Sequence, residues 1–426
     1  MSAAVDTVAA DDRGALFRTA SAWADMDAWH RRVAEIRRTA PILRVDDPGY
    51  APFWALTRHA DVLAVSRDNT TWHNTPRAVL GPDEDWDRML ASGMPLPATL
   101  VHLDATKHRT HRAVTNDWFK PAAVRHRQPR IEELADLYVE RMRALGGRCD
   151  FAEDIAKPYT LRVIMDIYGV PEEDEPLMMD LTQGIFGAAD PEYLGTAEDP
   201  GQRMTAAVMR FVQYFKELTA DRRACPADDL ATVIATGQVD GAPMGDIEQL
   251  WYYIIVATAG HDTTSYALSG GMEQLARDPA ALLFPLADDE AAIVNAAEEC
   301  IRWTSPVRHF MRYATVPASV GGVEIPEGGR ILLSYPSANR DEQVFRDPHV
   351  FSPTRPDATQ QLAFGGGAHF CLGAQFARRE LRTMLTRLSR ELTDVELAGT
   401  PEWSRSHFVS GGQTPPALLP HALRRE

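Results

Sequence analysis

The sequence is poor in cysteine, with four in 426 residues. These are Cys149, Cys225, Cys300 and Cys371, and successive cysteines lie more than 70 residues apart. Such wide spacing excludes a disulfide framework and the paired cysteines of a structural zinc site. We therefore expect the protein to work in a reducing compartment, the cytoplasm.

Long apolar runs are also missing. Residues 1–20 carry five charged side chains and no apolar stretch, which argues against a signal peptide or a membrane anchor. We expect these residues to be disordered and the protein to have no membrane partner. Acidic residues outnumber basic ones by 60 to 44, and the net charge of −16 argues against nonspecific nucleic-acid binding.

Linkers, repeats and low-complexity tracts are absent. The 28 glycines and 29 prolines are spread along the chain, and 45% of the residues are hydrophobic, enough for a large core. We therefore expect residues 21–426 to form one domain, although the length alone would allow two or three. Helical periodicity predominates, which predicts a mainly α fold with small β-sheets.

The periodicity predicts helices at residues 26–40, 59–66, 108–119, 128–146, 154–169, 174–187, 202–222, 226–235 and 289–303. Strands are expected at 42–45, at 53–56 and within 306–335. Residues 72–100 contain four prolines and no clear period, so we expect a long loop there. Pro243 and Pro279 bracket a proline-free stretch that predicts a helix of about 30 residues, roughly 45 Å long.

One cysteine lies in an unusual stretch, residues 363–373, which read AFGGGAHFCLG. The three consecutive glycines suit a tight loop, because glycine is costly in a helix or a strand. A helical pattern begins at Ala374, which places Cys371 where free N–H groups and the helix dipole favour a thiolate. A single thiolate held by amide donors suits an axial haem ligand. The alternative is a packed core cysteine after a glycine-rich turn.

The pattern Phe364-x-x-Gly367-x-x-x-Cys371-x-Gly373 resembles the haem-binding signature of the cytochrome P450 family. From about residue 40 onward the chain is similar to the bacterial soluble, ferredoxin-dependent class, and within it to the terpineol-oxidising branch. The resemblance implies the cytochrome P450 fold, with the long central helix over the haem. It further implies haem b as cofactor, Cys371 as the ligand of its iron, and a cofactor-binding loop that includes Phe364, Gly365, His369 and Gly373.

The middle of the long predicted helix reads Ala259-Gly260-His261-Asp262-Thr263-Thr264. Glycine, aspartate and threonine are poor helix formers, and such local conflicts concentrate at functional sites. Gly260 would permit a local widening of the helix. The stretch resembles the family's oxygen-binding groove, which implies that Asp262 and Thr263 are catalytic and relay protons. The alternative is a kinked structural helix, and His261 is interpreted as an ordinary polar neighbour.

Five further residues carry family resemblance. Glu299 and Arg302 stand at i, i+3 and can pair on one helical face. The resemblance implies that this structural pair is buried and braces the loop before Cys371, whereas most such pairs are surface salt bridges. His108 and Arg112 share a helical face at i, i+4, and with Arg312 they are implied to contact the haem propionates. The alternative for the first two is a solvated basic helix.

The substrate pocket is inferred from the resemblance alone. By matched position its lining comprises Ile255, Thr258, Ala259, Val307, Phe408 and Val409, all uncharged. An uncharged lining favours a small hydrophobic substrate, such as a monoterpene or an alkylbenzene. Arg308 and His309 depart from this pattern and could bind a carboxylate or a propionate, so a more polar biosynthetic substrate stays open.

Together these features predict a haem–thiolate monooxygenase that inserts one atom of O2 into a C–H bond. The chain has no flavin or iron–sulfur motif, so the resemblance implies electrons from NAD(P)H through a ferredoxin reductase and a ferredoxin. Arg109, Arg112, Arg378 and Arg379 could dock an acidic ferredoxin. The alternatives are a peroxygenase, disfavoured by the intact Asp262–Thr263 pair, and a haem-binding sensor, for which no output domain is visible.

Overall fold

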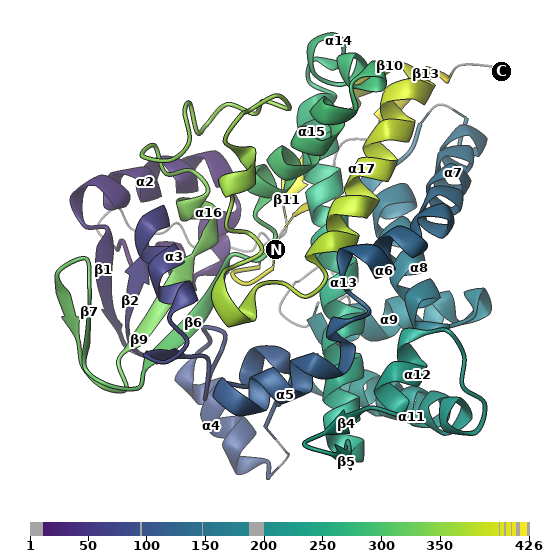
Figure 1. Ribbon diagram of the computed structural model, residues 1–426. Helices are drawn as coiled ribbons and strands as arrows, with labels where there is room; N and C mark the ends of the chain where they lie inside the picture. Colours follow the sequence, from purple (N-terminus) through teal and green to yellow (C-terminus); the bar gives the residue numbers. More distant parts are fainter. Residues whose placement is uncertain are drawn as a thin grey trace.

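Helices make up most of the computed structural model, and most of them lie to one side of a five-stranded sheet (Figure 1). The structure describes residues 12–93, 96–146, 148–186, 200–399, 401–403, 406–409, 411–414 and 418–423. The helices are α1 (Ala15–Arg18), α2 (Met26–Thr39), α3 (His59–Arg67), α4 (Asp83–Ala91), α5 (Ala105–Asn116), α6 (Pro121–His126), α7 (Gln128–Ala144), α8 (Lys157–Tyr168), α9 (Glu175–Phe186), α11 (Pro200–Ala224), α12 (Leu230–Ala235), α13 (Asp246–Leu275), α14 (Pro279–Leu282), α15 (Glu290–Thr304), α16 (Tyr335–Ala338) and α17 (Ala374–Glu391).

The main sheet has the strand order β1-β2-β9-β6-β3. Only β2 and β9 run parallel, and the other neighbours are antiparallel, as in the pairing of Val45 with Phe53. Its strands are β1 (Ile42–Asp47), β2 (Tyr50–Leu56), β3 (Trp72–His73), β6 (His309–Ala314) and β9 (Arg330–Ser334). Two-stranded sheets are formed by β4 (Gln238–Val239) with β5 (Ala242–Pro243), β7 (Ala318–Val320) with β8 (Val323–Ile325), β10 (Leu392–Leu397) with β13 (Leu418–Leu423), and β11 (Glu402–Trp403) with β12 (Gly412–Thr414). The predicted mainly α fold with small sheets is confirmed.

Helix α13 runs through the middle of the molecule (Figure 1) and is 30 residues long, as its bracketing prolines predicted. It is buried on most sides against α8 and α15. Glycines permit this close packing: a Cβ at Gly270 would lie 2.6 Å from the Thr304 methyl group, and one at Gly260 would lie 2.9 Å from Ile164. The helix is continuous through Gly260, so this residue gives room to α8 rather than widening the helix.

Two expectations differ from the structure. The loop expected at residues 72–100 contains α4, whose acidic first turn suits the positive end of the helix dipole. Within the segment expected to be disordered, residues 15–18 form α1, and Phe17 is buried in the core around Trp29. The Trp29 indole donates a hydrogen bond to the Leu16 carbonyl at 2.8 Å, which ties α1 to α2. Residues 1–11 lie outside the described part of the chain.

Across the described ranges, no helix is long and apolar enough to cross a membrane.

Candidate active site

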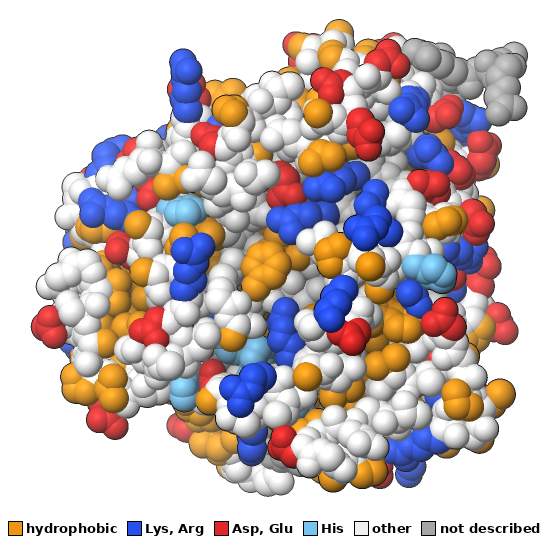
Figure 2. Space-filling model, in the orientation of Figure 1, with side chains coloured by type: hydrophobic (Ala, Val, Ile, Leu, Met, Phe, Trp, Pro, Cys, Tyr) orange, Lys and Arg blue, Asp and Glu red, His pale blue; other side chains and the backbone are white. Residues whose placement is uncertain are grey.

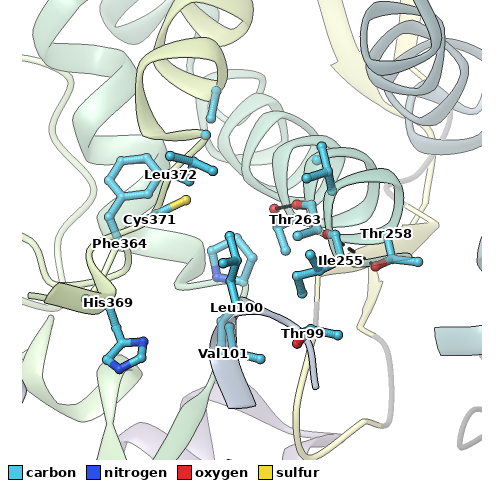
Figure 3. A pocket seen from close by; sticks show the side chains of 18 of the residues that line it. Thr99, Leu100, Val101, Ile255, Thr258, Thr263, Phe364, His369, Cys371 and Leu372 are labelled. Atoms are coloured by element: carbon cyan, nitrogen blue, oxygen red, sulfur yellow. Dashed lines mark hydrogen bonds between the residues drawn. The ribbon is translucent and has the colours of Figure 1, made fainter. Parts of the chain in front are cut away.

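A cavity of about 440 Å³ lies between α13 and the loop that precedes α17. Figure 3 shows the Cys371 thiol pointing into it from one side and Thr263 of α13 lying on the other. Leu100 and Val101, from the 3₁₀ turn Leu100–His102, form a further wall. The cavity therefore brings together the cysteine loop and the groove of the long helix, which are more than 100 residues apart in sequence.

The cysteine loop has the tight turns that its glycines predicted. Gly365 and Gly367 have φ angles of 71° and 66°, in the left-handed region that glycine adopts without strain. The Cys371 N–H donates to the Phe364 carbonyl at 2.9 Å, which closes the loop and leaves the thiol exposed to the cavity.

The surroundings on balance disfavour a free thiolate at this position. Burial raises the pKa of the Cys371 thiol, although hydrogen bonds from the N–H groups of Gly373 and Ala374 and the charges of Arg112 and Arg378 oppose the shift. The helix dipole predicted from the sequence favours the thiolate, but burial has a larger effect and raises the pKa of Cys371. A thiolate here needs a cation bound to it, and a coordinated metal ion deprotonates a thiol outright.

Cationic and imidazole side chains gather at one end of the cavity, which is lined by Arg112, Arg312, His108 and His369. The Arg112 guanidinium makes no hydrogen bond within the ranges described above. The His108 and His369 rings are 4.1 Å apart, and burial lowers the pKa of His108 to about 4. This end of the cavity carries an excess of positive charge that an anionic group would offset.

Asp104 is the carboxylate beside this cluster, and sequence reasoning missed it. It accepts hydrogen bonds from the Asn74 and Thr75 N–H groups, each at 2.9 Å, and lies 3.6 Å from His369. Burial opposes its ionisation, but hydrogen bonds from His369, Asn74 and Thr75 outweigh burial and hold the pKa of Asp104 well below its usual range. Asp104 therefore orients His369, and its single negative charge offsets only part of the charge of the two arginines, acting on Arg312.

These features fit haem. A thiol for the iron opens on an apolar cavity, and two arginines at one end suit the two propionates of the porphyrin. Within the described residues, no three His, Cys, Asp or Glu side chains gather in a way that would hold a metal ion among themselves. The Cys371 thiol in the cavity wall is the feature that fits an iron porphyrin.

The comparisons with known proteins agree with this geometry. The family model for cytochrome P450 matches residues 293–409. The chain is 36% identical to cytochrome P450-terp from a Pseudomonas species over 404 residues, 92% of this chain and 94% of the relative. The crystal structure of CYP108D1 from Novosphingobium aromaticivorans superposes with a TM-score of 0.87 at 39% identity, covering 95% of this chain and 97% of that one.

The chain belongs to the cytochrome P450 monooxygenase family. Its cofactor is haem b, as predicted, and its fold is that of the bacterial members. A second solved structure, Mycobacterium marinum CYP268A2 in complex with pseudoionone, superposes with a TM-score of 0.86 at 30% identity, covering 97% of this chain and all of that one.

In this cytochrome P450 the groove residues lie on the cavity face of α13. Asp262 and Thr263 both line the cavity, and Asp262 is 8% exposed. The Thr263 hydroxyl donates to the Ala259 carbonyl at 2.8 Å, so it is held against the helix. His261 is fully buried beside them, with Nδ1 3.1 Å from an Asp262 oxygen.

The Glu299–Arg302 pair is completely buried in this P450. Arg302 donates to both carboxylate oxygens, at 2.6 and 2.8 Å, and Arg355 and the Ser352 N–H also donate to Glu299. Arg302 further donates to the Asn339 carbonyl at 2.7 Å. These bonds offset the cost of burying two charges.

The pair reaches the haem loop through Asn339. The Asn339 side-chain oxygen accepts from the Leu362 N–H at 2.7 Å, and the Leu362 carbonyl accepts from the Gly365 N–H at 2.8 Å. Sequence reasoning missed a second buried carboxylate, Glu298, which accepts from Arg378 at 2.6 Å and so ties α15 to α17. The only sequence feature that could have indicated Glu298 is its position next to Glu299.

All six residues expected in the substrate pocket line the cavity, but Arg308 and His309 do not. The Arg308 guanidinium lies 3.8 Å from the centre of the Trp23 ring, away from the cavity. In β6, Phe310 and Arg312 line the cavity, so strand alternation turns His309 to the opposite face. Neither Arg308 nor His309 is therefore placed to bind a carboxylate in the cavity, the possibility that the sequence had left open.

His309 instead connects the two chain segments around Leu80 and His407, which lie beside the cavity. Its Nε2 accepts from the Leu80 N–H at 3.1 Å, and its Nδ1 donates to the His407 carbonyl at 3.1 Å. His407 in turn donates to the Leu80 carbonyl at 3.0 Å. Burial lowers the pKa of His309 to about 3, which keeps the ring neutral and able to accept. The neighbours Val79 and Phe408 line the cavity.

We predict that His309→Phe weakens substrate binding about tenfold, because both cavity walls lose hydrogen bonds worth roughly 1 kcal/mol each. His309→Gln, which can donate and accept, should recover most of this loss. The measurement is the dissociation constant from the substrate-induced spin-state change, with haem content as control. Equal constants for wild type and the phenylalanine variant would show that these bonds do not shape the pocket.

Proposed function

We propose that this cytochrome P450 inserts one oxygen atom of O2 into a C–H bond of a small hydrophobic substrate of monoterpene size. The observation that carries the proposal is the placement of the Cys371 thiol opposite Asp262 and Thr263, across one largely apolar cavity. Electrons come from NAD(P)H through a ferredoxin reductase and a ferredoxin, and the enzyme works in the cytoplasm as one catalytic domain.

The proposed cofactor contacts use residues from three parts of the chain: α5, β6 and the loop before α17. Cys371 would ligate the iron, and Arg112, Arg312, His108 and His369 would hold the propionates. Phe364, Gly365 and Gly373 would shape the loop around the ligand, where a Cβ at Gly373 would meet no atom within 4 Å. When bound, haem b supplies the oxygen activation and the oxidation of the C–H bond. The protein supplies the thiolate, the orientation of the substrate and the protons.

Two kinds of observation support the substrate class. The distal walls carry the uncharged side chains of Ile255, Ala259, Val307, Phe408 and Val409, and no carboxylate-binding arginine faces them in the described structure. Cytochrome P450-terp and CYP268A2, whose structure contains pseudoionone, are each similar in sequence to this chain along most of their length. We therefore favour a terpenoid over a charged natural product.

Asp262 and Thr263 have different proposed roles. The Thr263 hydroxyl, held by the Ala259 carbonyl, presents its oxygen to water in the cavity and positions that water. Asp262 is nearly buried but borders the cavity, so its carboxylate can pass protons inward from the solvent side.

We predict that Thr263→Ala still consumes NAD(P)H but releases hydrogen peroxide in place of most of the product, because the water that directs protonation is lost. Asp262→Asn should slow turnover about 10²-fold, or about 2.7 kcal/mol, because an amide cannot relay protons. The measurement is NAD(P)H consumption, peroxide and product in parallel, with α-terpineol as the first substrate. Variants that match wild type in rate and coupling would leave the pair with only a structural role.

The proposed ferredoxin surface is smaller than the sequence suggested. Arg112 lines the cavity and Arg378 pairs with Glu298, so neither is available to a partner. Lys and Arg side chains nevertheless gather over α17 and toward α5 on the face shown in Figure 2. Of the four arginines that the sequence suggested for this surface, Arg109 and Arg379 therefore remain as candidates for docking an acidic protein.

A further inference from the structure

One imidazole stands in the otherwise apolar wall formed by the turn Leu100–His102. We infer that His102 anchors an oxygen atom of the substrate by a hydrogen bond from or to Nε2. The substrate is then a small, mostly apolar alcohol or ketone rather than a plain hydrocarbon. This inference rests on the function proposed above and narrows its substrate class.

The His102 ring is held from one side only. Its Nδ1 lies 2.8 Å from the Thr99 hydroxyl, and its backbone N–H donates to the Thr99 carbonyl at 2.8 Å. The residue lines the cavity with Leu100 and Val101. In the part of the chain that the structure describes, Nε2 has no hydrogen-bond partner. The ring is therefore fixed in orientation while one of its two nitrogens stays available.

Two other hydroxyls on the substrate side of the cavity, those of Thr258 and Thr263, donate their protons to backbone carbonyls. Thr258 donates to the Ile254 carbonyl at 2.5 Å, and Thr263 donates to the Ala259 carbonyl at 2.8 Å. The Asn74 side-chain nitrogen donates to the Val101 carbonyl at 2.8 Å, and this residue belongs to the group around Asp104 and His369. His102 is thus the side chain of this wall best placed to recognise a polar atom.

The protonation state of His102 determines which atoms it can recognise. Burial lowers the pKa of His102 to about 4, so the ring is neutral near pH 7 and offers no charge to a carboxylate. If Thr99 donates to Nδ1, then Nε2 carries the proton and donates to a carbonyl or a hydroxyl oxygen. If Nδ1 donates to Thr99, then Nε2 accepts from a hydroxyl. A hydroxyl satisfies both tautomers, which makes an alcohol the better fit.

The test compares matched pairs of compounds that differ by one hydroxyl: α-terpineol with p-menth-1-ene, and 1-phenylethanol with ethylbenzene. Dissociation constants come from the substrate-induced spin-state change of the haem-loaded enzyme. Wild type should bind the alcohol of at least one pair about tenfold more tightly than the hydrocarbon. His102→Phe should remove this preference by weakening the alcohol alone, and His102→Gln should retain part of it.

Thr258→Val serves as the matched control, because its hydroxyl is already bonded to α13 and its loss should change the affinities for both members of a pair alike. An alcohol preference that survives in His102→Phe overturns the inference. A loss of haem from His102→Phe with an intact alcohol preference also overturns the inference. Such a result would mean that His102 contacts the haem propionates instead of the substrate. Equal binding of alcohols and hydrocarbons by wild type contradicts the anchor but leaves the proposed function standing. No spin-state change with any of the four compounds contradicts both.

Discussion

Replacing Cys371 with serine is expected to abolish the spectrum that reduced thiolate-ligated haem gives with carbon monoxide. Cys371 is the cysteine whose thiol opens on the cavity, while Cys149 and Cys300 are buried elsewhere in the core. A serine hydroxyl does not supply the thiolate that donates electron density to the iron and favours O–O cleavage. Monooxygenase activity should therefore be lost together with the spectrum.

The control is Cys225→Ser, because Cys225 is exposed and follows directly after α11. That variant should keep the wild-type spectrum and activity. A thiolate-type spectrum that persists in Cys371→Ser would assign the iron ligand to another residue and remove the basis of the proposed site.

Replacing Glu299 or Arg302 with alanine is expected to give mostly haem-free or insoluble protein. Without Glu299, the Arg302 guanidinium would lie in the core without its carboxylate. Arg355 would also lose its bond to Glu299 but would keep a 3.5 Å pairing with Asp357. Removing one partner of a buried pair costs about 3–5 kcal/mol, a large part of a typical total stability of roughly 5–15 kcal/mol. The measurements are soluble yield, the ratio of haem to protein and the melting temperature.

A surface pair in α4 gives the comparison. Arg88 and Glu84 also pair along one helical face, but their side chains are 67% and 84% exposed. Arg88→Ala should change stability by less than about 1 kcal/mol, because water and ions screen an exposed pair. If Glu299→Ala retained full haem occupancy and an unchanged melting temperature, the pair would not brace the haem loop.

The fold was predictable where apolar residues recur with a helical or strand period. Pro243 and Pro279 predicted the length of α13. The apolar residues that recur at helical spacing in 289–303 predicted α15, and this helix packs against α13 and α17. Helix α4 was missed because its apolar stripe, Trp86, Met89 and Leu90, is short and lies within a proline-rich segment, and none of its residues is fully buried. Its acidic first turn was a second local sign of a helix.

The site was predictable where its residues are neighbours in sequence. The spacing of Glu299 and Arg302 and the glycines before Cys371 are local patterns, and the structure places both as buried or cavity-facing groups. Asp104 was missed because its partner His369 lies 265 residues further along the chain. The orientation of His309 also depends on where β6 begins, since a shift of one residue exchanges the two faces of a strand.

The close contact between α13 and α15 has a consequence for how this enzyme can acquire new substrates. At Gly271 a methyl group would collide with Cys300, so the helices that carry the oxygen groove and the buried ion pair are locked together. The segment that carries Val79 has no such contact, because a Cβ at the nearby Gly81 would meet no atom within 4 Å. Evolution, or an engineer, can therefore vary selectivity through this segment while the packing of the two helices is kept.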